Sequence, residues 1–226
     1  MAISNNSTGL RTGVCTSTTR PTAPYEGQMI FETDTNRVLV WDNDAWVMIA
    51  DTDSPPAMQL VKPTSVTGGT IVGSSIAVGT AVSSVVISGA FSAEFDAYKI
   101  VYTGGLASAG VNLQTRLGST TTGYRSVMNG VSSASAAVQA YDNNTNTSWI
   151  WTGGASTTYC NYSVEIRQPF LSCPTFCENT LITNAADNYW NVRGSLADSN
   201  SYTAITIFPS SGTITGGTIA IYGYRK

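Results

Sequence analysis

The sequence predicts an all-β fold, with a small N-terminal three-stranded meander and a C-terminal, jelly-roll-like β-sandwich. Charged residues make up only 11% of the 226 residues, against about 25% in an average soluble protein, and the many Thr, Val, Ile and Tyr residues favour strands. The apolar fraction of 42% and the five tryptophans exclude a disordered chain. No long stretch repeats its apolar residues with the 3.6-residue period of an amphipathic helix.

Residues 1–19 are rich in Ser, Thr, Asn and Gly and predict an extended N-terminal arm. They contain neither the basic start nor the apolar segment of a secretory signal peptide, so we expect synthesis in a cytosol without export by that route. No apolar run approaches the roughly 18 residues of a membrane span, so we expect no membrane insertion. The net charge of −3 and the absence of a basic cluster argue against nucleic acid as a partner.

Residues 20–50 predict a meander of three short strands at 25–31, 37–41 and 46–50, separated by the turn sequences ETDTN and DNDA. About thirty residues are too few to bury a core of their own. The large aromatic side chains therefore either form a small core or dock on a neighbouring surface, and we expect a mixture of both roles. The candidate interface residues are Tyr25, Phe31, Trp41 and Trp46.

Residues 51–65 contain three prolines and predict a stiff, extended linker. From residue 66 to residue 226, short β-rich runs recur about every ten residues, with clusters of Gly, Ser, Asn and Thr between them. Eight or more strands at this spacing predict a β-sandwich. The last run, residues 216–226, is mostly apolar or small, and we expect it to be a central strand that closes the sheet.

Residues 140–154 join an Asx-rich stretch to two tryptophans and predict a loop that binds a sugar or another surface. The candidate ligand-binding residues are Asp142, Asn144, Asn146, Trp149 and Trp151. The alternation of Asx residues also fits calcium, but the Gly and the later Glu of an EF-hand loop are missing. A plain hairpin turn, with Trp149 or Trp151 in the core, is the alternative that the usual burial of Trp favours.

The chain contains no histidine, which excludes a Ser-His-Asp or Cys-His catalytic arrangement and a His-ligated catalytic zinc. Half of the fourteen carboxylates crowd into residues 26–53, where they are typical of turns, and no other pair has a distinctive spacing. We therefore expect a protein that is not an enzyme, and we expect no cofactor.

The four cysteines are Cys15, Cys160, Cys173 and Cys177. The Cys-x3-Cys spacing of the last two does not match a zinc ribbon, so we expect no metal site. Free, partly buried thiols are the expectation for a reducing cytosol. A disulfide among Cys160, Cys173 and Cys177 after release from the cell stays open, because spacing does not determine connectivity.

Residues 20–50 resemble a segment that recurs in tailed-bacteriophage virion proteins, notably fibres and other appendages. The matching positions are Arg20-Pro21-Thr22, Pro24, Gly27, Thr33-Asp34-Thr35, Trp41, Asp42 and Trp46. The end of the chain, SSGTITGGTIAIYGYRK, also resembles the closing strand of phage structural β-domains. The middle of the chain carries no such resemblance.

This resemblance implies a virion protein that is made in the host cytoplasm and released by lysis. It further implies a homotrimer in which residues 20–50 form an attachment and trimerisation module. The N-terminal arm would contact other virion proteins of the capsid or tail, and the sandwich would bind a host-surface glycan or receptor. The resemblance does not decide between tail and head.

Three functions remain at this stage. A tail or head fibre that binds the host ranks first, and a capsid decoration (cement) protein that clamps the head ranks second. A glycan-cleaving enzyme is a distant third, because the sequence lacks His and a distinctive carboxylate pair.

Overall fold

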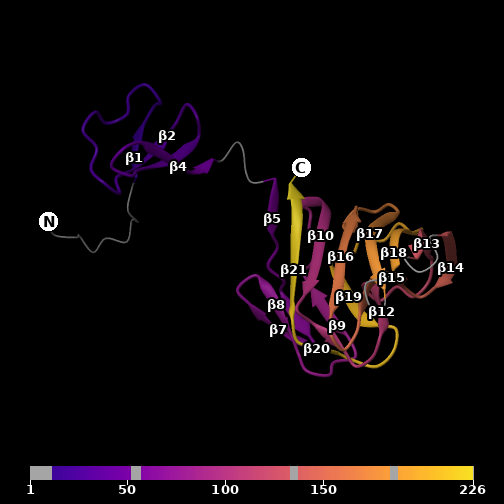
Figure 1. Cartoon of the computed structure of the whole chain (residues 1–226). Coiled ribbons are helices and arrows are strands. Elements are labelled where there is room, and N and C mark those ends of the chain that lie inside the picture. Colours follow the sequence, from indigo (N-terminus) through magenta and orange to yellow (C-terminus); the bar gives the residue numbers. More distant parts are fainter. Residues whose placement is uncertain (1–11, 52–56, 133–136, 184–187, 226) are drawn as a thin grey trace. The chain divides into compact units, whose positions relative to one another are not determined.

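The computed structural model describes residues 12–51, 57–132, 137–183 and 188–225. These residues form strands and turns and contain no helix, which confirms the predicted all-β class. The chain divides into a small unit, Met1–Pro56, and a large unit, Ala57–Lys226 (Figure 1).

The small unit is a four-stranded sheet in the order β1 (Gly13–Cys15), β2 (Met29–Glu32), β3 (Arg37–Trp41) and β4 (Trp46–Asp51). The meander β2–β3–β4 is antiparallel, whereas β1 runs parallel to β2. The sheet therefore has four strands where three are predicted, because Gly13–Cys15, within the predicted extended arm, forms strand β1. A parallel neighbour needs a long crossover, and residues 16–28 supply it.

The first strand of the meander begins later than predicted, at Met29 instead of Tyr25. The backbone N–H of Gln28 donates to the carbonyl of Tyr25 at 2.9 Å, and Gly27 has a positive φ of 79°. Residues 25–28 are therefore a turn, because the left-handed backbone at Gly27 breaks an extended strand.

The core of the small unit consists of Ile30 and Leu39, which are register partners on β2 and β3. The carboxylate of Glu32 is fully buried beside them and accepts hydrogen bonds from Nε of Arg20 and from Oγ1 of Thr35. The hydrogen bond from Arg20 is the main reason that the pKa of Glu32 lies below its usual value. A partly buried ion pair thus lies beside the two buried apolar residues of this unit.

The large unit is a β-sandwich whose first layer runs in the order β14-β13-β18-β17-β16-β10-β21, with β5 and β8 beside β21 and with β7 beside β8. Its second layer runs in the order β15-β12-β19-β9-β6. The strands of the first layer are β5 (Met58–Leu60), β7 (Gly69–Val72), β8 (Ser75–Val78), β10 (Phe95–Thr103), β13 (Tyr124–Ser132), β14 (Val138–Asn146), β16 (Cys160–Arg167), β17 (Thr175–Thr183), β18 (Asn188–Leu196) and β21 (Thr218–Arg225).

The strands of the second layer are β6 (Ser65–Thr67), β9 (Val85–Ser88), β12 (Val111–Leu117), β15 (Trp149–Ala155) and β19 (Ala204–Pro209). The short pair of β11 (Leu106–Ala107) and β20 (Ile214–Thr215) forms a separate ribbon. The two layers meet at β16, because its first residues pair with β15 and its last residues pair with β17.

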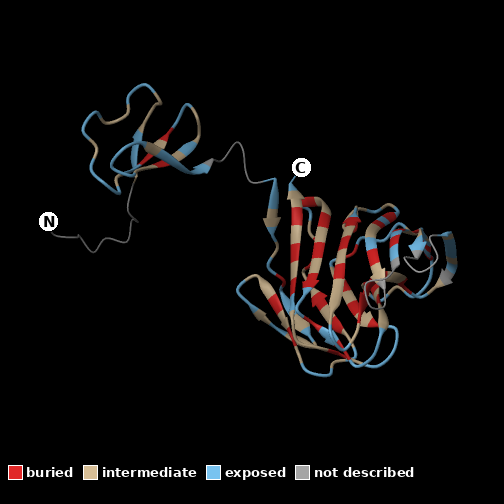
Figure 2. Cartoon of the chain, viewed as in Figure 1, coloured by how far each residue is buried: buried red, intermediate tan, exposed pale blue. Residues whose placement is uncertain are grey.

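Strict alternation places the core between the two layers, and Figure 2 shows buried and half-buried residues alternating along the strands. The inward residues of the first layer include Tyr98, Ile100, Val164 and Ile221, and those of the second layer include Leu113, Ile205 and Ile207. A buried hydroxyl network also joins the layers: Thr115 donates to Thr152 at 2.8 Å and bonds the hydroxyl of Tyr162 at 2.7 Å. This packed core lies directly beneath the strands that carry the outer face of the first layer.

The linker between the units is shorter than predicted. The range 51–65 was expected to be linker, but Asp51 ends β4, and Met58–Leu60 pairs with β21 as strand β5. The strand forms there because one side of β21 has backbone groups that need partners. Residues 52–56 lie outside the described part. As expected, β21 is a central strand, with β10 on one side and β5 and β8 on the other.

Candidate functional site

Residues 140–154 do not form the predicted loop. Residues up to Asn146 belong to β14, which pairs with β13, and residues from Trp149 belong to β15, which pairs with β12 and β16. The alternative prediction is correct in placing Trp149 in the core. Its hairpin is wrong, because β14 and β15 belong to different layers and do not pair with each other. Nε of Arg116 donates to the carbonyl of Thr147 at 2.9 Å and fixes the connection between them on β12.

The five candidate residues of this stretch lie in different surroundings. Trp149 is a core residue, packed edge-on against Tyr124 with ring centroids 5.3 Å apart. Asp142 is exposed and accepts a hydrogen bond from the amide of Asn144 at 3.2 Å. Asn146 and Trp151 are half-buried. Asp142 and Trp151 each line a hollow of the surface.

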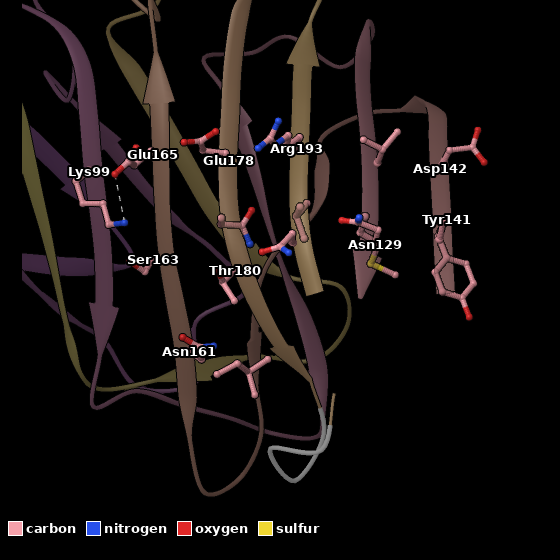
Figure 3. A pocket seen from close by; sticks show the side chains of 17 residues that line it. Lys99, Asn129, Tyr141, Asp142, Asn161, Ser163, Glu165, Glu178, Thr180 and Arg193 are labelled. Carbon is pink, nitrogen blue, oxygen red and sulfur yellow. Dashed lines mark ion pairs between the residues drawn. The ribbon is translucent and has the colours of Figure 1, made fainter. Parts of the chain in front are cut away.

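The hollow that contains Asp142 is a groove of about 1060 Å³ on the outer face of the first layer, which we call the polar groove. It crosses six adjacent strands, from β10 through β16, β17, β18 and β13 to β14. Register partners form a row across these strands, and Figure 3 shows its charged members following one another along the groove. The row consists of Lys99, Glu165, Glu178, Arg193, Val127 and Asp142.

A second row of uncharged polar residues lies beside the charged one, two residues away from it on each of the antiparallel strands. Thr180 pairs with Asn191, and Asn191 pairs with Asn129, so these side chains share one face. Ser163 and Asn161 of β16 continue this polar lining (Figure 3). Amide groups donate and accept hydrogen bonds, as hydroxyl groups do. This lining can therefore donate hydrogen bonds to the hydroxyl groups of a ligand and accept hydrogen bonds from them.

The charges of the polar groove largely compensate one another. Nζ of Lys99 lies 3.6 Å from Oε1 of Glu165, which also accepts a hydrogen bond from the hydroxyl of Tyr224 at 3.1 Å. Glu178 accepts a hydrogen bond from Arg167. The lining holds two cationic and three acidic side chains, so its field is weak and favours an uncharged ligand.

The four aromatic candidates of the small unit lie in different surroundings. Tyr25 is 70% exposed in its turn. Trp41 and Trp46 pair across β3 and β4 with ring centroids 5.5 Å apart, on the face of the sheet that carries Leu39. Phe31 lies on the other face, because its neighbour Ile30 points into the core. The expected mixture of core and docking roles stays a prediction: Trp41 and Trp46 are half-buried on the core face, whereas the buried apolar positions are Ile30 and Leu39.

The face of the small sheet that carries Phe31 is apolar across all four strands. We call it the apolar face, and its residues are Val14, Met29, Phe31, Val38, Val40, Val47 and Ala50. Val14 is 69% exposed, and Met29 and Val47 are each 42% exposed. A contiguous apolar surface of this kind marks an interaction site more often than an ordinary solvent-facing surface.

The four cysteines are free thiols. Burial raises the pKa of Cys177 strongly and that of Cys160 to about 12, so neither forms a thiolate near neutral pH. Among the described residues, no group of three or more His, Cys, Asp or Glu side chains could hold a metal ion. In the same residues, no helix has the length and apolar character of a membrane span.

The comparisons with known proteins do not identify a family. No protein-family model matches the chain. No curated protein matches it either. Among solved structures, a chain from the structure of infectious bursal disease virus, Gt strain, is 7% identical, with a TM-score of 0.12. The match covers 82% of this chain and 48% of that one, and its TM-score is too low to support any inference about fold or function.

Sequence reasoning missed most of the polar groove, including Asn129, Asn161, Asn191 and Arg193. The signal for them was present in the strands themselves. In CNYSVEIR and NYWNVRGSL, polar residues occupy every second position between apolar ones, which is the pattern of a strand with one solvated face. What the pattern does not provide is the lateral order of the strands.

Proposed function

We propose that this chain is a structural component of a bacteriophage virion, namely a homotrimeric tail or head fibre-type protein. Its N-terminal part attaches it to other virion proteins, and its β-sandwich binds a glycan on the host surface. The observation that carries the binding role is the polar groove. The virion setting rests on the resemblance of residues 20–50 to phage appendage proteins.

The chemistry of the polar groove supports a glycan ligand. Its amide and hydroxyl groups, on Asn129, Asn191 and Thr180, match the mixed donors and acceptors of sugar hydroxyls. Its near-balanced charges favour an uncharged polymer over an acidic one. Six strands span roughly 24 Å at the usual strand separation, which gives space for an extended oligosaccharide.

The apolar face supports self-association through the small unit. A sheet of this size leaves one face to bury, and copies of the same surface around a threefold axis would cover it. Phe31 would then lie in the interface as expected, whereas Trp41 and Trp46 would lie on the opposite side of the sheet and Tyr25 in an exposed turn. Neighbouring virion proteins would meet the trimer at this end.

A capsid decoration protein is the second candidate, and the apolar face favours it equally. Such a protein would use that face to clamp neighbouring capsid subunits and would not need a polar groove. Gold-labelled antibody on intact particles separates the two functions, because label on the tail or on fibre tips supports adhesion. Label spread over the head, with polysaccharide binding absent, would replace the fibre proposal by decoration.

Glycan binding is tested by titrating the full chain with a panel of bacterial surface polysaccharides. The double variant Asn129→Ala/Asn191→Ala removes two amides at the centre of the polar groove. We expect it to weaken binding about tenfold or more, since each hydrogen bond contributes about 1 kcal/mol. The control is Asn200→Ala, which removes an exposed amide far along the chain in the loop that follows β18. Equal binding by both variants, or no binding by the natural chain, would overturn the role of the groove.

Self-association is tested by analytical ultracentrifugation. We expect the double variant Met29→Lys/Val47→Lys to dissociate the trimer, because it places two charges on the apolar face. Met48→Lys is the matched control, since Met48 is 52% exposed on the opposite face of the same sheet. A natural chain that sediments as a monomer at micromolar concentration would rule out the trimer.

A further inference from the structure

A second hollow, of about 360 Å³, lies where the first layer extends beyond the second, and we call it the aromatic cleft. The side chains of Leu181 and Trp190 are buried at this site, and Met128, Tyr141 and Trp151 complete the apolar wall. Asn112 of β12 and Ser210, which follows β19, supply polar groups to the lining. Its size falls within the range of about 300–1,000 Å³ that is typical of small-molecule sites.

The aromatic cleft has a core of its own beneath it. Leu181, Trp190 and Val192 form a buried cluster that is separate from the main core, with Met128 and Trp151 packed against it. Tyr141 meets Trp190 edge-on, with ring centroids 5.6 Å apart, and remains 47% exposed. An exposed ring held against a buried one keeps its orientation without being covered.

Two features hold these aromatic walls in place before any ligand arrives. A Cβ atom at Gly130 would lie 2.8 Å from Cε3 of Trp190 and 2.0 Å from the carbonyl of Tyr189, so only glycine lets β13 approach the indole this closely. The amide of Asn179 donates to the carbonyl of Trp151 at 3.0 Å and fixes the backbone of the second indole. A prepared wall of this kind lowers the entropy cost of binding.

We infer that the aromatic cleft is a second ligand subsite, which takes a single uncharged sugar ring against Tyr141, Trp151 and Trp190. The apolar C–H face of a pyranose matches an aromatic wall, and the lining groups of Asn112 and Ser210 can bond its hydroxyls. This inference rests on the proposed function, because it assigns a further part of the same host glycan to this chain.

The position of the aromatic cleft relates it to the polar groove. Tyr141 and Asp142 are consecutive in β14, and register partners on β13 place Tyr141 beside Met128 and Asp142 beside Val127. Neighbouring residues of a strand point to opposite faces, but Tyr141 and Met128 line the polar groove as well as the cleft, so the two hollows adjoin at the edge strand β14. A branched glycan can therefore lie along the groove and place a side branch in the cleft.

The test uses the full chain labelled with 5-fluorotryptophan and titrated with methyl glycosides of glucose, galactose, mannose and N-acetylglucosamine. We expect at least one glycoside to shift the fluorine resonances of Trp151 and Trp190 while that of Trp149 stays in place. Tyr141→Ala should weaken this binding about tenfold, through loss of one aromatic contact face. Tyr189→Ala is the control, because Tyr189 is 54% exposed on the outer face of the same layer. Unmoved resonances, or equal weakening by both variants, would overturn the inference.

The same titration separates this inference from the proposed function. The groove variant Asn129→Ala/Asn191→Ala should leave glycoside binding at the aromatic cleft unchanged while it weakens polysaccharide binding. If the groove variant weakens polysaccharide binding and no glycoside shifts the resonances of Trp151 and Trp190, the inference about the cleft fails and the proposed role of the groove is supported. If the glycosides bind at the cleft and the groove variant has no effect on polysaccharide, the groove assignment fails and the cleft stands.

Discussion

The two units of this chain are stabilised in different ways. The large unit packs two layers around more than twenty buried apolar residues, among them Tyr98, Trp149 and Ile205. The small unit, in its described residues 12–51, buries Ile30 and Leu39 beside the carboxylate of Glu32. Apolar burial scales with chain length, so the larger unit reaches a stable core by packing alone while the smaller one depends on a polar contact.

This difference bears on what each unit can do with its surface. Because the large unit is stable through its interior, its outer face is free to carry the polar residues of the groove. The small unit leaves the apolar face exposed, and covering that face is the main further source of stability open to it. This difference supports the proposal that the large unit binds a ligand and that the small unit mediates assembly.

The largest expected loss of stability comes from a substitution in the core of the large unit. Trp149→Ala should lower its free energy of unfolding by about 3–5 kcal/mol, because it removes a fully buried indole and leaves a cavity. Urea unfolding, followed through fluorotryptophan resonances, reports the large unit through Trp151 and Trp190 and the small unit through Trp41 and Trp46. A loss in the small unit as large as that in the large unit would contradict the independence of the two cores.

The next largest loss of stability is expected when the ion pair between Arg20 and Glu32 in the small unit is removed. Arg20→Ala leaves Glu32 buried without its cation and should lower the free energy of unfolding of this unit by about 2 kcal/mol. The loss is smaller than that for a fully enclosed pair, because the side chain of Arg20 is 36% exposed. The resonances of Trp41 and Trp46 provide the measurement. Arg20→Lys should restore part of the stability, and an unchanged midpoint for Arg20→Ala would refute a structural role of the pair.

Lowering the pH should reduce the stability of the small unit by a smaller amount. The pKa of Glu32 is lowered in the folded chain, chiefly by the hydrogen bond from Arg20. Its stabilisation is therefore fully present above the unfolded-state pKa of about 4.3 and is lost as the pH falls through the folded-state pKa. We expect the small unit to weaken below that range, by less than in Arg20→Ala because a neutral carboxyl still accepts hydrogen bonds. Glu32→Gln should flatten this pH dependence, and an equal slope in both proteins would count against it.

The smallest expected change in stability is for a substitution on the outer surface of the large unit. Asn191→Ala should change its free energy of unfolding by less than about 0.5 kcal/mol, because this exposed side chain contributes little to packing. The same change should weaken polysaccharide binding. Paired measurements of urea midpoint and affinity would show whether stability and binding are separate, and a marked loss of stability would mean that the polar groove also supports the fold.

Local patterns in the sequence determined the class of the fold and several of its elements. The strand at 37–41 was predicted with the bounds of β3, and the Asx turn after it is held by Oδ1 of Asp42, which accepts from the backbone of Asp44 and Ala45. Such features depend on residues that are close in the chain, so alternation and turn chemistry suffice to recognise them.

Pairing between distant residues was decided only by the tertiary structure. Gly13–Cys15 and Met58–Leu60 are short segments that become strands because β2 and β21 offer unpaired edges. Asp142 and Trp151 were named from the sequence, but their separation into a groove and a cleft depends on which strands neighbour β14 and β15. A strand's own residues specify which face points inward, whereas its lateral partners are specified by packing against residues far away in the chain.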